Sequence, residues 1–323
     1  MFKELNENLK EKITGFNPWT NAYGLARSLI GLATLLTLLF NDSSILFKPA
    51  IGLEEYPFCK NNLSIFCLVP NDYQYLEIIR WVCIVILVLV VIGWRPRFTG
   101  IPHYWIMYSL QNSATVIDGG EQIGTVITLL LVPITLCDHR KWHWTVVTDK
   151  DESFLSIYKV VTIYCFWIAI RIQMAIVYAN AALERLKNVE WADGTAIYYF
   201  FNDPMFGIPD YLAVLLDPIL NSPIVVILTW GTTILELFLF SALISPKKYW
   251  NIFLWSGIFL HTSIALLLGL YSFSLIMIGC LLLFLHPLDQ TIKLLLKVRT
   301  GAGGTDFLSS QSYRREKRVP DDP

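Results

Sequence analysis

Four ionisable residues lie inside strongly apolar stretches of this sequence, and they are the first candidates for chemistry: Arg27, Arg171, Glu236 and His261. Lipid offers such side chains no partner, so within a membrane they usually pair with one another or line a functional cavity. Histidine can also exchange a proton near neutral pH. These positions therefore predict polar sites held inside a membrane.

Eight apolar stretches must position these residues: Ala22–Phe40, Leu76–Trp94, Ile101–Ile117, Gln122–Cys137, Phe154–Tyr178, Ser222–Ile244, Trp250–Leu268 and Ser272–Leu285. Most are long enough to cross a hydrocarbon core of about 30 Å at ~1.5 Å per residue. Hydrophobic residues make up 54% of the chain and charged residues only 16%, which is less charge than soluble domains carry. We therefore expect an all-α polytopic membrane protein with about eight transmembrane helices. A net charge of −1 gives no reason to expect nucleic-acid binding.

The distribution of Lys and Arg between the stretches predicts the orientation. If the N-terminus is cytoplasmic, the outside loops hold only Lys48, Lys60, Arg185 and Lys187, and the other connections are richer in basic residues. This excess favours both termini inside. We divide the chain into a leader (1–20), a transmembrane domain (21–287) and a basic, partly disordered cytoplasmic tail (288–323). The leader has helical spacing typical of an amphipathic helix on the membrane surface, and a disordered polar segment is the alternative.

Depth within the membrane predicts which polar residues meet. Arg27 and Glu236 both lie about 4–6 Å to the cytoplasmic side of their helix midpoints, so we expect them to pair as a structural bridge, with catalysis as the alternative. Arg171 and His261 lie toward the outside, where they would share an outward-open cavity with Asp118 and the neighbouring Glu121. No metal-ligand spacing links any two of the five His, so no metal is expected.

Two long outside loops, 41–75 and 179–221, carry further features. The first contains Cys59 and Cys67, which predict a structural disulfide on the oxidising side of the membrane; a redox-active pair is the alternative. The second contains the apolar segments Ala196–Phe201 and Tyr211–Leu220, separated by prolines. We expect interfacial or re-entrant helices there, since irregular backbone at membrane depth must be buried in protein or line a cavity.

The segment Leu186–Tyr199 resembles a signature of the HTTM family, bacterial membrane proteins related to the membrane domain of vitamin K-dependent γ-carboxylase. In that family a basic residue precedes a Trp, and a Gly and an aromatic residue follow; here these are Arg185, Trp191, Gly194 and Tyr198. Asp118 with its two following glycines and His261 are also similar to the family. The resemblance implies an HTTM-like bundle in which these residues bind substrate or catalyse.

Within that group the chain resembles the SdpB family, through FNPWTNAYGLARS at 16–28 and EWADGTAIYYFFNDPMFG at 190–207. This resemblance implies a multi-pass protein of the bacterial plasma membrane. It also implies a role in maturing a secreted antimicrobial peptide of the sporulation-delaying type. The implied partners are an SdpA-like protein, an SdpC-like precursor peptide and membrane lipids.

One position departs from the γ-carboxylase pattern. There a lysine before the Trp acts as a base toward a quinol, whereas Arg185 stands here and is a poor base because its pKa stays above about 12. Lys187 could serve only if burial lowered its pKa; the alternative is a solvated lysine paired with Glu184 or Glu190. A quinone-dependent enzyme with a quinone or other lipid cofactor therefore remains an alternative to peptide maturation, as does a non-enzymatic export or immunity protein.

Overall fold

The computed structural model describes residues 16–49, 56–59, 63–147, 154–204 and 207–292. Regular structure in this part of the chain is helical, apart from one isolated bridge between Trp94 and Trp142. Eight long helices follow the eight apolar stretches: α2 (Ala22–Phe40), α4 (Tyr73–Ile92), α5 (Pro96–Ser113), α6 (Gly119–Cys137), α7 (Phe154–Leu186), α11 (Ile224–Ser241), α12 (Trp250–Leu268) and α13 (Tyr271–Leu285). Most of the predicted leader and tail lies outside the described residues.

Six of these helices are long and apolar enough to cross a membrane: α2, α4, α6, α7, α11 and α12. Helix α13 is apolar but has only 15 residues, about 22 Å at 1.5 Å per residue. Helix α5 is less apolar, with Arg97, His103 and Pro102 in its first half. The structure thus supports a multi-pass membrane protein with six candidate spans, while eight spans with both termini inside remain a prediction.

Local sequence explains where several helices begin and end. The Asp72 side chain accepts a hydrogen bond from the Gln74 amide at the start of α4, which satisfies one of the amides left free there. Helix α4 ends at Gly93, with φ +85°, a left-handed conformation that glycine adopts most readily. Helix α12 ends in the same way at Gly269, with φ +70°.

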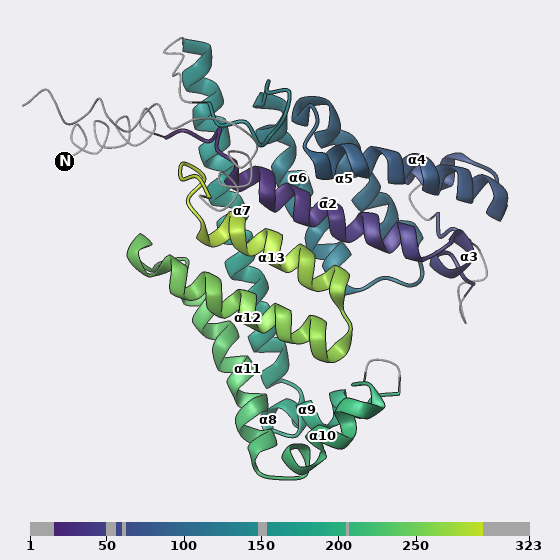
Figure 1. The fold of residues 1–323 in the computed structure, drawn as a ribbon, viewed down its shortest axis with the longest axis vertical. Helices are drawn as coiled ribbons and strands as arrows, with labels where there is room; N and C mark the ends of the chain where they lie inside the picture. The colour runs from purple at the N-terminus through teal and green to yellow at the C-terminus, as the bar shows by residue number, and fades with distance from the viewer. Residues whose placement is uncertain (1–15, 50–55, 60–62, 148–153, 205–206, 293–323) are drawn as a thin grey trace, which may run out of the picture.

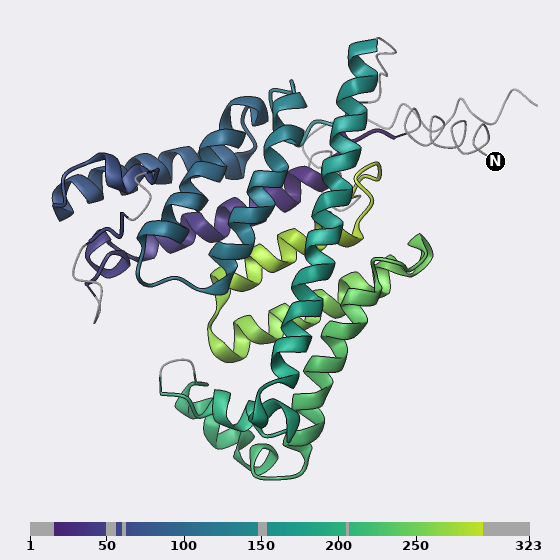
Figure 2. The ribbon, with the colours of Figure 1, turned by 180° about the vertical axis from the view of Figure 1, so that it is seen from behind.

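The long helices run in two main directions. Helices α7 and α11 pack together and run along the length of the molecule, whereas α2 and α13 lie side by side at a steep angle to α7 (Figures 1 and 2). Helix α12 packs between α13 and α11, α6 contacts α5 and α7, and α4 covers α2. This arrangement places α13 near the centre of the bundle.

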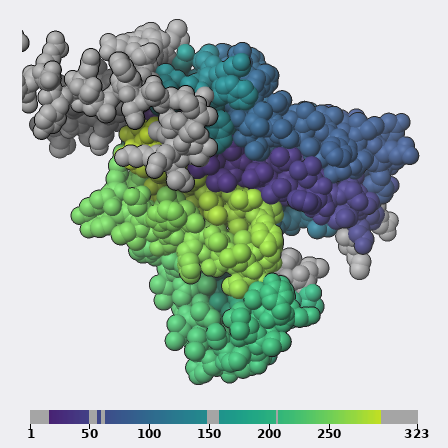
Figure 3. All heavy atoms as spheres, viewed as in Figure 1, coloured from purple at the N-terminus to yellow at the C-terminus, as the bar shows by residue number. Residues whose placement is uncertain are grey.

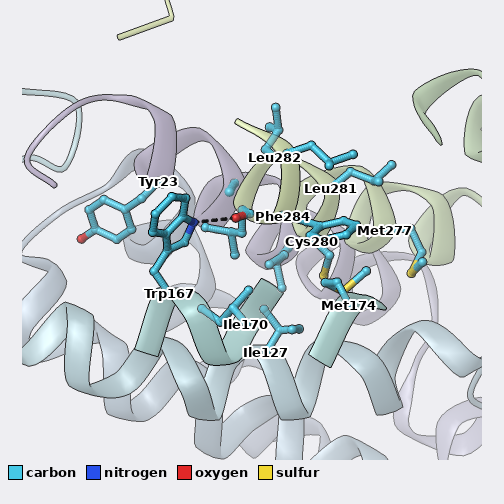
Figure 4. Packing of buried hydrophobic residues seen from close by; sticks show 14 of the residues in the cluster. Tyr23, Ile127, Trp167, Ile170, Met174, Met277, Cys280, Leu281, Leu282 and Phe284 are labelled. Atoms are coloured by element: carbon cyan, nitrogen blue, oxygen red, sulfur yellow. Dashed lines mark hydrogen bonds between the residues drawn. The ribbon is translucent and has the colours of Figure 1, made fainter. Parts of the chain in front are cut away.

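The main hydrophobic core lies where α7 faces α13. Trp167, Ile170 and Met174 of α7 point toward Cys280 and Phe284 of α13 (Figure 4). The Trp167 indole Nε1 donates a hydrogen bond of 2.8 Å to the Leu283 carbonyl. Leu283 lies in the last turn of α13, where four carbonyls lack intrahelical partners. The bond satisfies one of these carbonyls and joins the end of α13 to α7.

Shorter helices fill the connections: α3 (Ser43–Leu46), η1 (Ile65–Leu68), α8 (Val189–Ala192), α9 (Ala196–Phe201), α10 (Asp210–Leu220) and η2 (Lys247–Tyr249). The second long loop therefore contains helices at both predicted apolar segments. The α8–α10 segment forms the far end of the molecule, beyond α12 and α13 (Figures 1 and 3). It covers the ends of α7 and α11, where the candidate site lies.

Candidate functional site

A partly buried ion pair joins α7 to α11 beneath the α8–α10 segment. Arg185, in the last turn of α7, lies 2.8 Å from Glu236 Oε1 and donates a weaker hydrogen bond of 3.3 Å to the Thr232 hydroxyl. The Arg185 guanidinium also lies over the Trp191 ring, 4.2 Å from its centroid. Aromatic faces attract cations, so α8 completes the surroundings of this arginine.

A polar stripe on α11 supports this pair. Thr229, Thr233 and Glu236 are all buried and lie three or four residues apart, a spacing that places them on one face of a helix. The Thr229 hydroxyl accepts a hydrogen bond of 3.3 Å from the Ile197 amide at the start of α9. The same face of α11 therefore holds both the charge and the α9 backbone.

A second polar contact lies two turns earlier on α7. The Tyr178 hydroxyl is 3.0 Å from Nε2 of His261 on α12, and both side chains are buried. The His261 ring also packs edge-on against Phe273 of α13, with centroids 5.6 Å apart. Since Tyr178 and Arg185 are seven residues apart, they share a face of α7; α7 thus connects the two contacts.

Two atoms of this cluster are buried with no hydrogen-bond partner among the described residues: Glu236 Oε2 and His261 Nδ1. A buried polar atom without a partner is costly. Such atoms can bind a polar ligand, bind water or exchange a proton. We call Arg185, Glu236, Trp191, Tyr178 and His261 the α7–α11 cluster and take it as the candidate functional site.

Gly194 brings the connection between α8 and α9 close to α11. Its φ of +87° is left-handed, and a Cβ atom at this position would lie 2.7 Å from Val226 Cγ1. Only glycine satisfies both requirements without strain. Gly194 therefore acts through the backbone, whereas Tyr198 is half-buried in α9 beside Tyr199.

Arg171 does not share a cavity with His261, which corrects the prediction. Its Nε donates a hydrogen bond of 2.9 Å to the carbonyl of Phe284, near the end of α13, whereas His261 contacts Phe273, near the start. Eleven residues of helix separate these levels by about 16 Å. Depth from a helix midpoint is a poor guide here, because α7 runs to Leu186, eight residues beyond the predicted end at Tyr178.

The predicted pair of Arg27 and Glu236 is also wrong, because each residue has other partners. Arg27 donates to the Thr99 hydroxyl at 2.7 Å and lies 3.5 Å from His143 Nδ1, while Glu236 binds Arg185. Helix α2 packs on α13 and α4, whereas α11 packs on α7 and α12. Equal depth could not reveal that the two helices are not neighbours.

The predicted substrate residues Asp118 and Glu121 form a capping box at the start of α6. Asp118 Oδ1 accepts from the Gly120 amide at 2.7 Å, and Glu121 Oε2 accepts from the Asp118 amide at 3.2 Å. Asp118 also accepts a hydrogen bond from the Ser272 hydroxyl at 2.9 Å. These bonds satisfy free helix amides and tie α6 to α13, so we expect a structural role for both residues.

The remaining predicted residues lie in the loops. Lys187 is exposed and forms an ion pair with Glu184 at 2.6 Å. This is the alternative given above, a solvated lysine paired with a neighbouring glutamate. Cys59 and Cys67 are joined in a disulfide with Cα atoms 5.7 Å apart. No group of three metal-binding side chains gathers anywhere in the described ranges.

A buried cluster that the sequence did not reveal lies at the start of α2. Arg140 binds Asp138 through two nitrogens, at 2.9 and 2.8 Å, and its third nitrogen donates to the carbonyls of Thr20 and Thr145. The Tyr23 hydroxyl donates to the same carboxylate at 2.6 Å. Asp138 and Arg140 are two residues apart, and this short spacing of opposite charges was a usable signal for their ion pair. Tyr23 is 115 residues away from Asp138, so the sequence gives no signal for its hydrogen bond.

His143 lies beside this cluster, in a space left by two glycines. A Cβ atom on Gly93 would lie 2.2 Å from the His143 ring, and one on Gly24 would lie 2.9 Å from it. Burial, together with the charges of Arg27 and Arg140, holds the pKa of His143 well below its usual range. The imidazole is therefore neutral and serves as a packed hydrogen-bonding residue.

Two proteins of Bacillus subtilis (strain 168) are similar to this chain over most of their lengths. Sporulation-delaying protein SdpB is 49% identical over 289 residues, which cover 89% of this chain and 88% of SdpB. The chain belongs to the SdpB family. The uncharacterized protein YitO is 51% identical over 290 residues, or 89% of this chain and 93% of YitO. No family model and no solved structure matches the chain, so the wider HTTM resemblance stays a prediction based on its motifs.

Proposed function

We propose that this protein acts in producing a secreted antimicrobial peptide of the sporulation-delaying type, by helping to mature its precursor at the membrane. The observation that carries this proposal is the 49% identity to sporulation-delaying protein SdpB over 89% of the chain. An identity of this size over nearly full length favours a shared role. An SdpA-like protein and an SdpC-like precursor are the proposed partners.

We infer that the α7–α11 cluster is the polar centre of the precursor-binding site. The α8–α10 segment supplies Trp191 over Arg185, and Glu236 keeps one oxygen without a partner among the described residues. A carboxylate oxygen accepts hydrogen bonds from peptide amides, and Trp rings pack against apolar side chains. This combination suits a peptide with both kinds of group.

The test compares intact masses of peptides secreted by producing cells with and without this gene, with the precursor gene and its exporter held constant. A missing segment would identify support for cleavage, a loss of two hydrogens a disulfide, and a gain of carbon dioxide a carboxylation. Equal masses in equal amounts would refute the proposal. Equal masses in unequal amounts would replace maturation by export or immunity.

A further inference from the structure

A cavity of about 680 Å³ lies at the end of the bundle away from the α7–α11 cluster. It is bounded by α7, η2, the start of α12 and the residues flanking α2 and α13. Its walls include the rings of Phe16, Tyr164, Trp167 and Trp250. Two cationic side chains, Arg171 and Lys247, also line it, so the cavity combines positive charge with apolar surface.

Arg171 uses only part of its hydrogen-bonding capacity. Its Nε donates to the Phe284 carbonyl, and the guanidinium lies over the Trp250 ring at 4.0 Å from the centroid. The Nη2 atom is buried without a partner among the described residues, where no carboxylate lies within ion-pair distance of Arg171. A guanidinium has five N–H donors and pairs well with phosphate oxygens, so it can bind an anion here.

Lys247 supplies the second charge from the connection between α11 and α12. It is exposed, and its Nζ lies 5.9 Å from the Trp250 centroid. Asp289 also lines the cavity, but it is exposed and forms no ion pair with either cation in the described structure. Two cations against one solvated carboxylate leave the cavity with a net preference for an anion.

The cavity wall continues onto apolar surface of α7. Ile168 and Ile172 line the cavity and are 36% and 44% exposed. An exposed isoleucine on a membrane-spanning helix suits contact with acyl chains. The cavity thus offers an anion site that borders on a surface for hydrocarbon.

We propose that this cavity binds an anionic phospholipid, with its phosphate at Arg171 and Lys247 and an acyl chain along Ile168 and Ile172. The bound lipid would join the start of α12 to α7, and it would supply the partner that Arg171 Nη2 lacks. Charge complementarity selects the phosphate, and the exposed isoleucines select a lipid over free phosphate. This site is separate from the α7–α11 cluster.

The test is native mass spectrometry of the full-length protein in detergent, titrated with phosphatidylglycerol, phosphatidylcholine or inorganic phosphate. We expect phosphatidylglycerol to bind most tightly. K247Q removes an exposed charge and should weaken its binding about three- to fivefold. The matched control K248Q removes the neighbouring charge, which lies over Tyr249 outside the cavity, and should change little.

R171Q should weaken phosphatidylglycerol binding about tenfold or more, since charge-assisted bonds to phosphate are strong. Because Arg171 also caps α13, K247Q is the decisive variant. Equal binding of phosphatidylcholine, or equal weakening by K247Q and K248Q, would overturn the proposal. Inorganic phosphate binding as tightly as the lipid would identify a free-phosphate site and overturn the assignment to lipid.

Discussion

Two arginine–carboxylate pairs, one buried and one partly buried, lie at opposite ends of the bundle and differ in how completely they are bonded. Asp138 accepts bonds from two nitrogens of Arg140 and from the Tyr23 hydroxyl, and the remaining nitrogen of Arg140 binds two backbone carbonyls. Glu236 meets Arg185 through one oxygen only, and its other oxygen has no partner among the described residues. Both carboxylates are buried.

This contrast separates the pair that supports the fold from the pair that is available for a ligand. A buried pair stabilises only when its remaining donors and acceptors are satisfied, and the Asp138 pair meets this condition. The Glu236 pair does not, so its free oxygen is a cost that a bound ligand or water would remove. Four predictions test this comparison.

The largest effect is expected from D138N. This change removes the charge opposite Arg140, whose side chain is 6% exposed, and breaking a buried pair costs about 3–5 kcal/mol. This loss of stability is measured as the free energy of unfolding of the purified protein in mixed detergent micelles. K141Q, an exposed neighbour, is the control. Equal stability of D138N and K141Q would refute a structural role for the first pair.

For E236Q we expect a smaller loss of stability together with a loss of secreted peptide activity. Glutamine keeps the size and one acceptor oxygen, so the stability loss should be smaller, about 1–3 kcal/mol. Secreted peptide activity should fall about tenfold or more at equal protein level, equivalent to about 1.4 kcal/mol. The free energy of unfolding in mixed detergent micelles measures the stability, and a toxicity assay measures the secreted peptide activity. Immunoblotting of membranes checks that the protein level is equal. Unchanged peptide output would show that Glu236 does not belong to the site. The two pairs would then not differ in function.

A smaller loss is expected from Y178F. It leaves the ring packed but removes the hydroxyl 3.0 Å from His261 Nε2, which should lower the unfolding free energy by about 1–2 kcal/mol. Y164F is the matched control on the same helix, because its hydroxyl has no hydrogen-bond partner among the described residues. If the unfolding free energy falls equally in Y178F and Y164F, the Tyr178–His261 contact does not belong to the cluster.

The smallest effect is expected from K187Q. The Lys187 side chain is 69% exposed and its ion pair with Glu184 lies at the surface, where such pairs contribute about 0–1 kcal/mol. Stability and peptide output should both stay near the values of the unchanged protein. A selective loss of peptide output would restore Lys187 as a candidate base and move the site from Glu236 to the loop.

Part of this site could be predicted from the sequence. The apolar stretches located α7, α11 and α12, and the polar residues within them identified Glu236 and His261 as unusual. The motif around Trp191 identified Arg185 and Gly194. Tyr178 was missed because a tyrosine in an apolar helix is common, although its seven-residue distance from Arg185 was a usable signal.

The helical membrane architecture, the family and the positions of the intramembrane charges could all be inferred from the sequence. These follow from hydropathy, helix period and similarity, which are read along one chain. The partners of these charges depend on the folded structure: Glu236 binds Arg185 and not Arg27, and Arg171 caps α13 instead of meeting His261. Partner choice depends on which helices are neighbours, and that is set by packing over whole helix surfaces, which no single stretch of sequence contains.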